Sequence, residues 1–126
     1  MCLFRKRNPF EKNSKKYIED RFTFLIDRGY ECEYFNRGGE EEFVFAKGTA
    51  QIEVYSFNTH FSPFAFEVVI SDMGFESDKR KNINAFLGIG VEDIQSLSPM
   101  ETVDFYAETV RNNIDQIETA IFSIRR

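Results

Sequence analysis

The chain has 126 residues, of which 42% are apolar and 29% are charged, and it includes 15 phenylalanines but no tryptophan. This composition predicts one globular domain over residues 1–126 and excludes an intrinsically disordered chain. The net charge of −5 and the many acids in residues 29–71 argue against a nucleic-acid partner. No apolar run reaches the length that crosses a membrane, so we expect no membrane partner.

The chain has two cysteines and no disulfide framework is expected, because Cys2 lies at the extreme N-terminus and Cys32 on the apolar face of the first strand, where a free thiol behaves as a small apolar side chain. We expect both to be reduced thiols in a cytoplasmic protein. The N-terminus lacks the apolar core of a signal peptide. Lipidation of Cys2, next to the basic residues 5–7, is the alternative for this end of the chain.

The N-terminal part predicts an arm over residues 1–12 and then a helix that begins near Asn13 or Ser14, either of which can cap it. Gly29 predicts the end of this helix, because glycine adopts the left-handed conformation without a steric penalty. The helix carries one apolar stripe at helical spacing, formed by Ile18, Phe22, Leu25 and Ile26.

Residues 30–71 then alternate between apolar and polar, which predicts four antiparallel strands at 30–36, 42–47, 50–58 and 64–71. Glycines at 38–39 and 48 predict tight turns between them. Because consecutive strands with short connections usually pair, we expect a meander.

The alternation assigns two different faces to these strands. One face is apolar and is the expected core face: Tyr30, Cys32, Tyr34, Phe43, Phe45, Ile52, Val54, Phe64, Phe66, Val68 and Ile70. The other mixes acids with aromatic side chains, and its candidate partner-binding residues are Glu33, Phe35, Glu53, Tyr55, Phe57 and Glu67. Aromatic side chains ringed by charge are typical of protein interfaces. The alternative is that a helix or residues 72–97 cover this face and make it a second core.

Residues 72–97 are too many for a structureless loop. We expect a short strand or helical turn near 84–89 and another near 91–96. Ser98, Pro99 and Glu101 then predict the start of a long C-terminal helix, since they form a capping box with proline at the first helical position. Its apolar seam is formed by Val103, Tyr106, Ala107, Val110, Ile114, Ile117, Ile121 and Ile124.

The expected fold class is therefore α+β. It comprises an N-terminal helix, a four-stranded antiparallel meander, an irregular segment and a long C-terminal helix. Each helix has a single apolar stripe, so both should pack on the same, apolar face of the sheet.

We predict no catalytic residues, no cofactor and no metal site. His60 is the only histidine, and no cysteine stands at metal-ligand spacing from it. Neither cysteine has the basic surroundings that activate a thiolate. Gly88 and Gly90 are only a fragment of a dinucleotide fingerprint.

Two segments carry a family resemblance. Residues 22–31, Phe22-Thr23-Phe24-Leu25-Ile26-Asp27-Arg28-Gly29-Tyr30-Glu31, resemble a helix end in several small, uncharacterised bacterial α+β families. The helix Phe105-Tyr106-Ala107-Glu108-Thr109-Val110-Arg111-Asn112-Asn113-Ile114, with Asp115 to Phe122, resembles their closing helix. Some of these families look like immunity proteins of bacterial toxin systems. The resemblance implies a small cytoplasmic binding protein and transfers no binding residue.

These features favour a non-enzymatic protein-binding module, an immunity-type inhibitor whose acidic, aromatic sheet face binds a basic protein. One alternative is a small-ligand-binding or enzymatic domain. Its pocket would lie between the sheet and residues 72–97, lined by Phe75, Phe86 and Leu87. The other is a homo-oligomeric structural protein that uses the same aromatic face.

Overall fold

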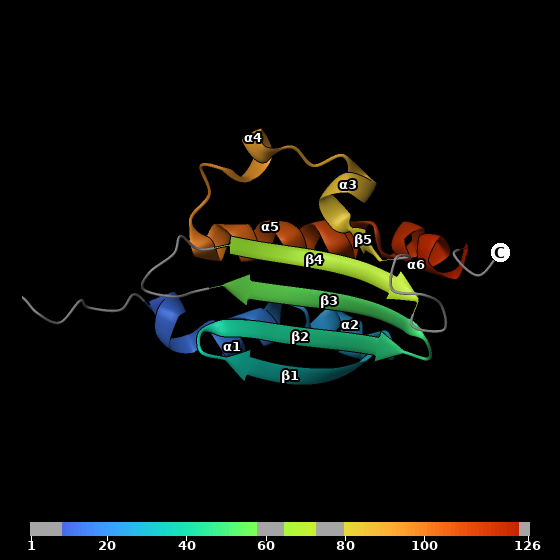
Figure 1. Ribbon diagram of the computed structural model, residues 1–126, viewed down its shortest axis with the longest axis horizontal. Coiled ribbons are helices and arrows are strands. Elements are labelled where there is room, and N and C mark those ends of the chain that lie inside the picture. Colours follow the sequence, from blue (N-terminus) through green and yellow to red (C-terminus); the bar gives the residue numbers. More distant parts are fainter. Residues whose placement is uncertain (1–8, 58–64, 73–79, 124–126) are drawn as a thin grey trace, which may run out of the picture.

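A computed structural model describes residues 9–57, 65–72 and 80–123 as an α+β fold in two layers (Figure 1). The helices are α1 Pro9–Arg21, α2 Thr23–Asp27, α3 Ile83–Leu87, α4 Val91–Ile94, α5 Pro99–Asn112 and α6 Ile114–Ser123. The strands are β1 Glu31–Arg37, β2 Glu40–Lys47, β3 Ala50–Phe57, β4 Ala65–Asp72 and β5 Lys81–Asn82. Helices α1, α2, α5 and α6 lie behind the sheet in Figure 1.

The sheet is an antiparallel meander in the order β1-β2-β3-β4-β5. The four predicted strands are confirmed within one or two residues at each described end, while Asn58 and Phe64 lie outside the described residues. The predicted meander lacked β5, which pairs Lys81 with Ile70 and Asn82 with Val69. Two residues are too few to show the alternation by which a strand is recognised.

Glycines make the tight turns of the meander, as predicted. Gly38 and Gly39 have φ of 62° and 98° and form the whole connection between Arg37 and Glu40, which pair across β1 and β2. Gly48 has φ of 63° at the next turn. Two successive residues with positive φ give a hairpin turn whose twist matches that of the strands.

The core lies between the sheet and the helices behind it. The predicted apolar face is buried on β2, β3 and β4: Phe43, Phe45, Ile52, Val54, Phe66, Val68 and Ile70. Phe22 joins the layers, with its ring centroid 6.0 Å from that of Phe45 and 6.4 Å from that of Phe66. The burial prediction was wrong for Cys32, which is exposed, because β1 is an edge strand whose side chains are exposed along most of its length.

The N-terminal helix differs from its prediction in two ways. It begins at Pro9 rather than near Asn13 or Ser14, so the expected arm was too long. It is also interrupted at Phe22, and α2 follows as a separate short helix. Ile26 was expected in the buried stripe but is 45% exposed, because the interruption turns the second segment.

The end of α2 follows the predicted glycine signal. Gly29 has φ of 104°, its N–H donates to the carbonyl of Ile26, and the N–H of Tyr30 donates to the carbonyl of Leu25. This pair of bonds is a Schellman motif, which satisfies carbonyl groups at a helix end. The motif turns the chain directly into β1.

The C-terminal segment is two helices rather than one long helix. The capping box at Ser98 and Glu101 is confirmed. The helix is broken at Asn113, whose side-chain amide donates to the carbonyl of Thr109 at 2.8 Å. The apolar seam nevertheless stays buried across the break. Its last member, Ile124, lies outside the described residues.

Residues 80–97 contain the two short elements expected near 84–89 and 91–96, and both are helical. Helix α3 is capped by the Asn82 side chain, which accepts from the N–H of Asn84 at 2.8 Å. Tyr106 of α5 donates to the amide oxygen of Asn84 at 2.8 Å, so α3 is tied to α5 at the β4 side of the sheet. No helix among the described residues is long and apolar enough to cross a membrane.

Candidate protein-interaction face

The sheet surface that points away from the helices (Figure 1) is here called the outer face. It is built from four cross-strand rows of residues. The register gives Glu31-Ala46-Gln51-Ser71, Glu33-Val44-Glu53-Val69, Phe35-Glu42-Tyr55-Glu67 and Arg37-Glu40-Phe57-Ala65. The structure therefore brings all six predicted partner-binding residues onto one face. It places Phe35, Tyr55 and Glu67 in a single row.

Exposure is uneven across the outer face. On the β1 side, Glu33 is exposed and Phe35 is 40% exposed. Glu67 of β4 is also exposed, and Tyr55 and Phe57 are half-buried. Glu53 is only 7% exposed. The most exposed part of the outer face is therefore strand β1, with Glu33 and Phe35, together with Glu67 on β4.

The buried Glu53 is in contact with Arg80, which precedes β5. Its guanidinium pairs with Glu53 Oε2 and lies 3.0 Å from the Tyr55 hydroxyl. The Tyr55 hydroxyl donates to the same Glu53 oxygen at 2.6 Å. Burial, and then the Glu53 carboxylate, raise the pKa of Tyr55. Among the described residues of 72–97, Arg80 thus contributes a side chain to this face, which is part of what the alternative interpretation expected.

Sequence reasoning missed Arg80, and no pattern could have indicated it. Arg80 lies 27 residues after Glu53 in the chain and directly precedes β5, itself too short to predict. The strand register alone places Glu53 and Tyr55 correctly but cannot identify a cation that reaches them from beyond the sheet.

A second arginine also lies on the outer face. The guanidinium of Arg37 is 5.9 Å from the centre of the Phe35 ring, and its Nη1 is 3.6 Å from Glu42 Oε1. The rings of Tyr55 and Phe57 stack at 6.5 Å with 13° between their planes. Among the described residues, six glutamates of the outer face stand against these two arginines. The face is therefore aromatic and strongly acidic.

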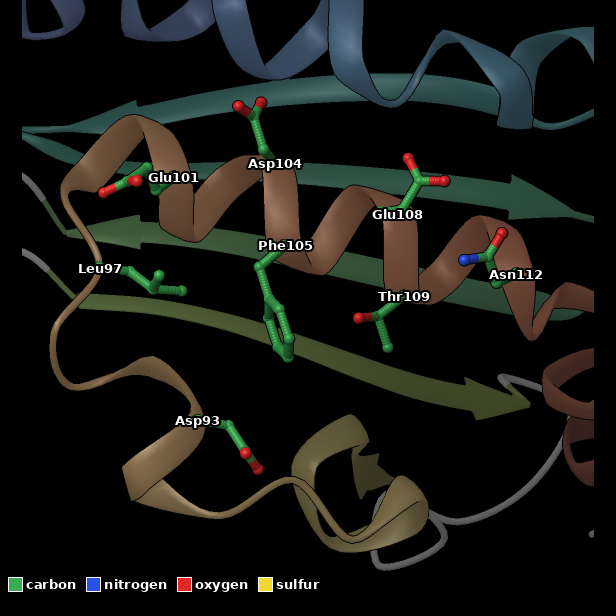
Figure 2. A pocket seen from close by; sticks show the side chains of 8 residues that line it. All are labelled: Asp93, Leu97, Glu101, Asp104, Phe105, Glu108, Thr109 and Asn112. Carbon is green, nitrogen blue, oxygen red and sulfur yellow. The ribbon is translucent and has the colours of Figure 1, made fainter.

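A groove of about 550 Å³ runs along α5 and is a second candidate site (Figure 2). Its lining residues are Asp93, Leu97, Glu101, Asp104, Phe105, Glu108, Thr109 and Asn112. Phe105 and Thr109 point from α5 toward the α4 side, whereas Asp104 and Glu108 point toward α1 (Figure 2). Phe86 and Leu87 do not line this groove and pack against the core instead, and Phe75 lies outside the described residues. This groove is therefore not the pocket predicted between the sheet and residues 72–97, which stays a prediction.

The carboxylates of the groove are mostly engaged in structural contacts. Asp104 accepts from Arg21 Nε at 2.6 Å and from the Tyr17 hydroxyl at 2.7 Å. Glu101 accepts from the Ser98 N–H at 2.9 Å, and Asp93 accepts from the Gly90 N–H at 2.9 Å. Acid–base catalysis needs carboxylates that converge on one substrate atom. These carboxylates instead hold helix ends and the α1–α5 contact.

Other reactive groups show no arrangement for catalysis within the described part of the chain. The Cys32 side chain is exposed, and partial burial of its thiol, followed by the Glu19 carboxylate, raises its pKa. That shift favours the thiol over the nucleophilic thiolate. No three His, Cys, Asp or Glu residues in this part come together to hold a metal ion. His60 lies outside the described residues.

No protein-family model, curated protein or solved structure matches this chain.

Proposed function

We propose that this chain is a non-enzymatic protein-binding module whose outer face docks a basic protein. The observation that carries the proposal is the outer face itself. Glu33, Phe35, Glu53, Tyr55, Phe57 and Glu67 share it, no described helix covers it, and its glutamates outnumber its arginines.

The two kinds of side chain on this face have different parts in binding. Exposed glutamates such as Glu33 and Glu67 attract a basic surface and speed its approach, an effect that salt screens. Phe35 and Tyr55 provide apolar area that a partner can bury at the centre of the contact. We expect the affinity to depend on the aromatic residues and the association rate to depend on the glutamates.

The biological role that we propose is an immunity-type inhibitor of a bacterial toxin. Toxins that cleave nucleic acid need a basic surface for the phosphate backbone. An acidic face complements such a surface and blocks it by occupying it. This role also agrees with the resemblance of residues 22–31 and 105–122 to immunity-like families. A toxin gene next to this gene would identify the partner to be tested.

The experiment is a binding titration with that purified toxin, or capture from the native host where no such gene is present, at about 0.05 M and about 0.5 M salt. We expect the complex to weaken at high salt. Phe35→Ala and Glu67→Gln should each weaken it, since both side chains are exposed on the outer face. Glu108→Gln on α5 is the matched control, because it removes an exposed carboxylate from the opposite layer.

A captured protein counts as the partner only if it is basic and is lost with the outer-face variants but retained with Glu108→Gln. Equal retention by Phe35→Ala, Glu67→Gln and the control would disprove the assignment of binding to the outer face.

A second candidate function is binding of a small ligand in the groove along α5. Its volume of about 550 Å³ falls within the range of ligand sites. No lysine or arginine is among the described residues that line it, and Phe105 offers an aromatic surface, so the chemistry favours an apolar cation. A thermal-shift screen with aromatic amines tests this function. A shift that Phe105→Ala abolishes supports it, and a shift that this variant leaves unchanged contradicts it.

A further inference from the structure

Strand β1 is one edge of the sheet, and among the described residues it pairs with β2 alone (Figure 1). Six of its seven side chains are exposed and one is half-buried, whereas β2 alternates regularly between buried and half-buried positions. Its open side chains include Cys32 and the 40% exposed Phe35. A long edge strand of this kind offers unpaired backbone groups to another strand.

The turn next to β1 determines which backbone groups face the open edge. Arg37 and Glu40 flank the two-residue turn and are register partners. In such a hairpin the residues flanking the turn exchange hydrogen bonds, and every second pair after them does the same. Residues 31, 33, 35 and 37 therefore bond to β2. The N–H and C=O groups of Cys32, Tyr34 and Asn36 point away from the sheet.

These outward groups suit an antiparallel copy of the same strand. A two-fold axis through Tyr34 sets Cys32 opposite Asn36 of the partner subunit, and Tyr34 opposite its own copy. All three outward positions then form hydrogen-bonded pairs. In this register Glu31 lies opposite Arg37 of the partner subunit, twice by symmetry, and no like charges face each other. Opposite charges directly across two strands are stabilising.

The neighbouring registers are less suitable. An axis through Glu33 sets this residue against its own copy, and like charges in that position are destabilising. An axis through Phe35 also sets Glu33 opposite Arg37 of the partner subunit, but it pairs only residues 33–37, gives two hydrogen-bonded pairs instead of three and leaves Cys32 without a partner. Arg37 is free to form a new pair, because its side chain is 67% exposed and its contact with Glu42 is long, at 3.6 Å.

We infer that two copies of this chain associate through β1 in antiparallel register, with the axis at Tyr34 and Glu31–Arg37 pairs at both ends. This interface uses the strand edge and leaves the outer face open, so the two outer faces become one continuous acidic surface. The inference is independent of the proposed function, because a basic protein can bind the outer face of either one copy or two.

The sharpest test is a register-specific disulfide. Asn36→Cys is made in a Cys2→Ser background and oxidised. Paired residues at such a position have Cα atoms about 5.5 Å apart, which suits a disulfide. Within one strand, Cys32 and a cysteine at 36 are about 13 Å apart, so an internal bond cannot form. We expect a reducible covalent dimer. Asn112→Cys, at an exposed position of α5, is the matched control and should form no covalent dimer.

A charge exchange tests the same register without a covalent bond. Glu31→Arg and Arg37→Glu should each weaken the dimer at least about tenfold in sedimentation equilibrium, since each puts like charges opposite at two sites. The double variant Glu31→Arg/Arg37→Glu should restore it. A wild-type protein that is monomeric at all concentrations, together with equal cross-linking of Asn36→Cys and Asn112→Cys, would overturn the inference. Failure of the double variant to restore the dimer would overturn the register.

Discussion

Glu118 of α6 is the residue on which contacts from Arg28, at the end of α2, and Tyr30, just before β1, converge. Its Oε1 accepts from Arg28 Nη2 at 2.7 Å, and its Oε2 accepts from Arg28 Nε at 3.0 Å and from the Tyr30 hydroxyl at 2.7 Å. The side chain is only 14% exposed. The pKa of Glu118 is lowered, chiefly by the hydrogen bonds from Arg28. This carboxylate joins the end of α2 and the start of β1 to α6.

Glu118→Gln keeps the shape of the side chain but removes the charge that Arg28 and Tyr30 bind. We expect a loss of about 1.5–3 kcal/mol in the free energy of unfolding, which is typical for hydrogen bonds to a charged group. Urea denaturation at neutral pH measures it. Glu108→Gln is the control and should change stability by less than about 0.5 kcal/mol, because Glu108 is exposed.

The same pair of proteins gives a pH test. The folded pKa of Glu118 lies below its unfolded value of about 4.3. The stabilisation is therefore complete above the unfolded pKa and is lost as the pH falls through the folded pKa. The stability difference between wild type and Glu118→Gln should shrink as the pH is lowered from 7 toward 3. A difference that stays constant over this range contradicts the assignment.

At the level of elements, the seam of α5 and α6 is the main support of the sheet. Ile117 is fully buried, and α6 contacts both β3 and β4. Ile117→Ala should lower the free energy of unfolding by about 2–5 kcal/mol, because it removes buried methyl groups and leaves a cavity. Ile26→Ala is the matched control: with Ile26 45% exposed, it should cost less than about 0.5 kcal/mol. Equal losses in chemical denaturation would show that the seam is not core.

The elements that could be predicted from the sequence are those whose apolar pattern repeats over many residues. The strands and the seam of α5 and α6 repeat often enough for their buried faces to be read directly. The breaks at Phe22 and Asn113 could not be predicted, because a single non-helical residue leaves the helical spacing of the apolar residues in the sequence almost unchanged. Strand β5 could not be predicted either, since its existence depends on pairing with Val69 and Ile70.

The candidate site was predictable to a similar extent. Alternation is sufficient to put Glu33, Phe35 and Tyr55 on one face, because successive side chains of a strand point to opposite faces of the sheet whatever the rest of the fold. It cannot say which strand lies at the edge of the sheet, and so it misplaced Cys32 in the core. It also cannot supply Arg80, whose contact with Glu53 arises from the path of the chain after β4.

Across the whole molecule, tyrosine hydroxyls form a recurring kind of contact. All five tyrosines of the chain lie in the described part, and each hydroxyl donates to a side-chain oxygen. The pairs are Tyr17–Asp104, Tyr30–Glu118, Tyr34–Glu41, Tyr55–Glu53 and Tyr106–Asn84. These bonds join α1 to α5, the start of β1 to α6, β1 to β2, and α5 to α3. Only the Tyr55 pair lies within one strand.

Each of these tyrosines has a raised pKa, with burial as the largest cause and a carboxylate as the next cause in four of them. For Tyr34 the pKa is raised to about 12. A raised folded pKa means that the stabilisation is complete below the unfolded value of about 10 and is lost as the pH rises above it. We therefore expect the folded protein to show almost no phenolate absorbance at pH 10, whereas the urea-unfolded chain titrates there.

Because the pairs connect different elements, their loss should be cooperative. As the pH is raised beyond 10, the phenolate absorbance and the loss of far-ultraviolet circular dichroism should follow one common transition. Tyr34→Phe removes one pair between adjacent strands and should reduce the amplitude of the absorbance change by about one fifth while leaving a single transition. Phenolate absorbance that rises well before the circular dichroism changes would show that the hydroxyl–acceptor pairs open one at a time and are not lost in one cooperative transition.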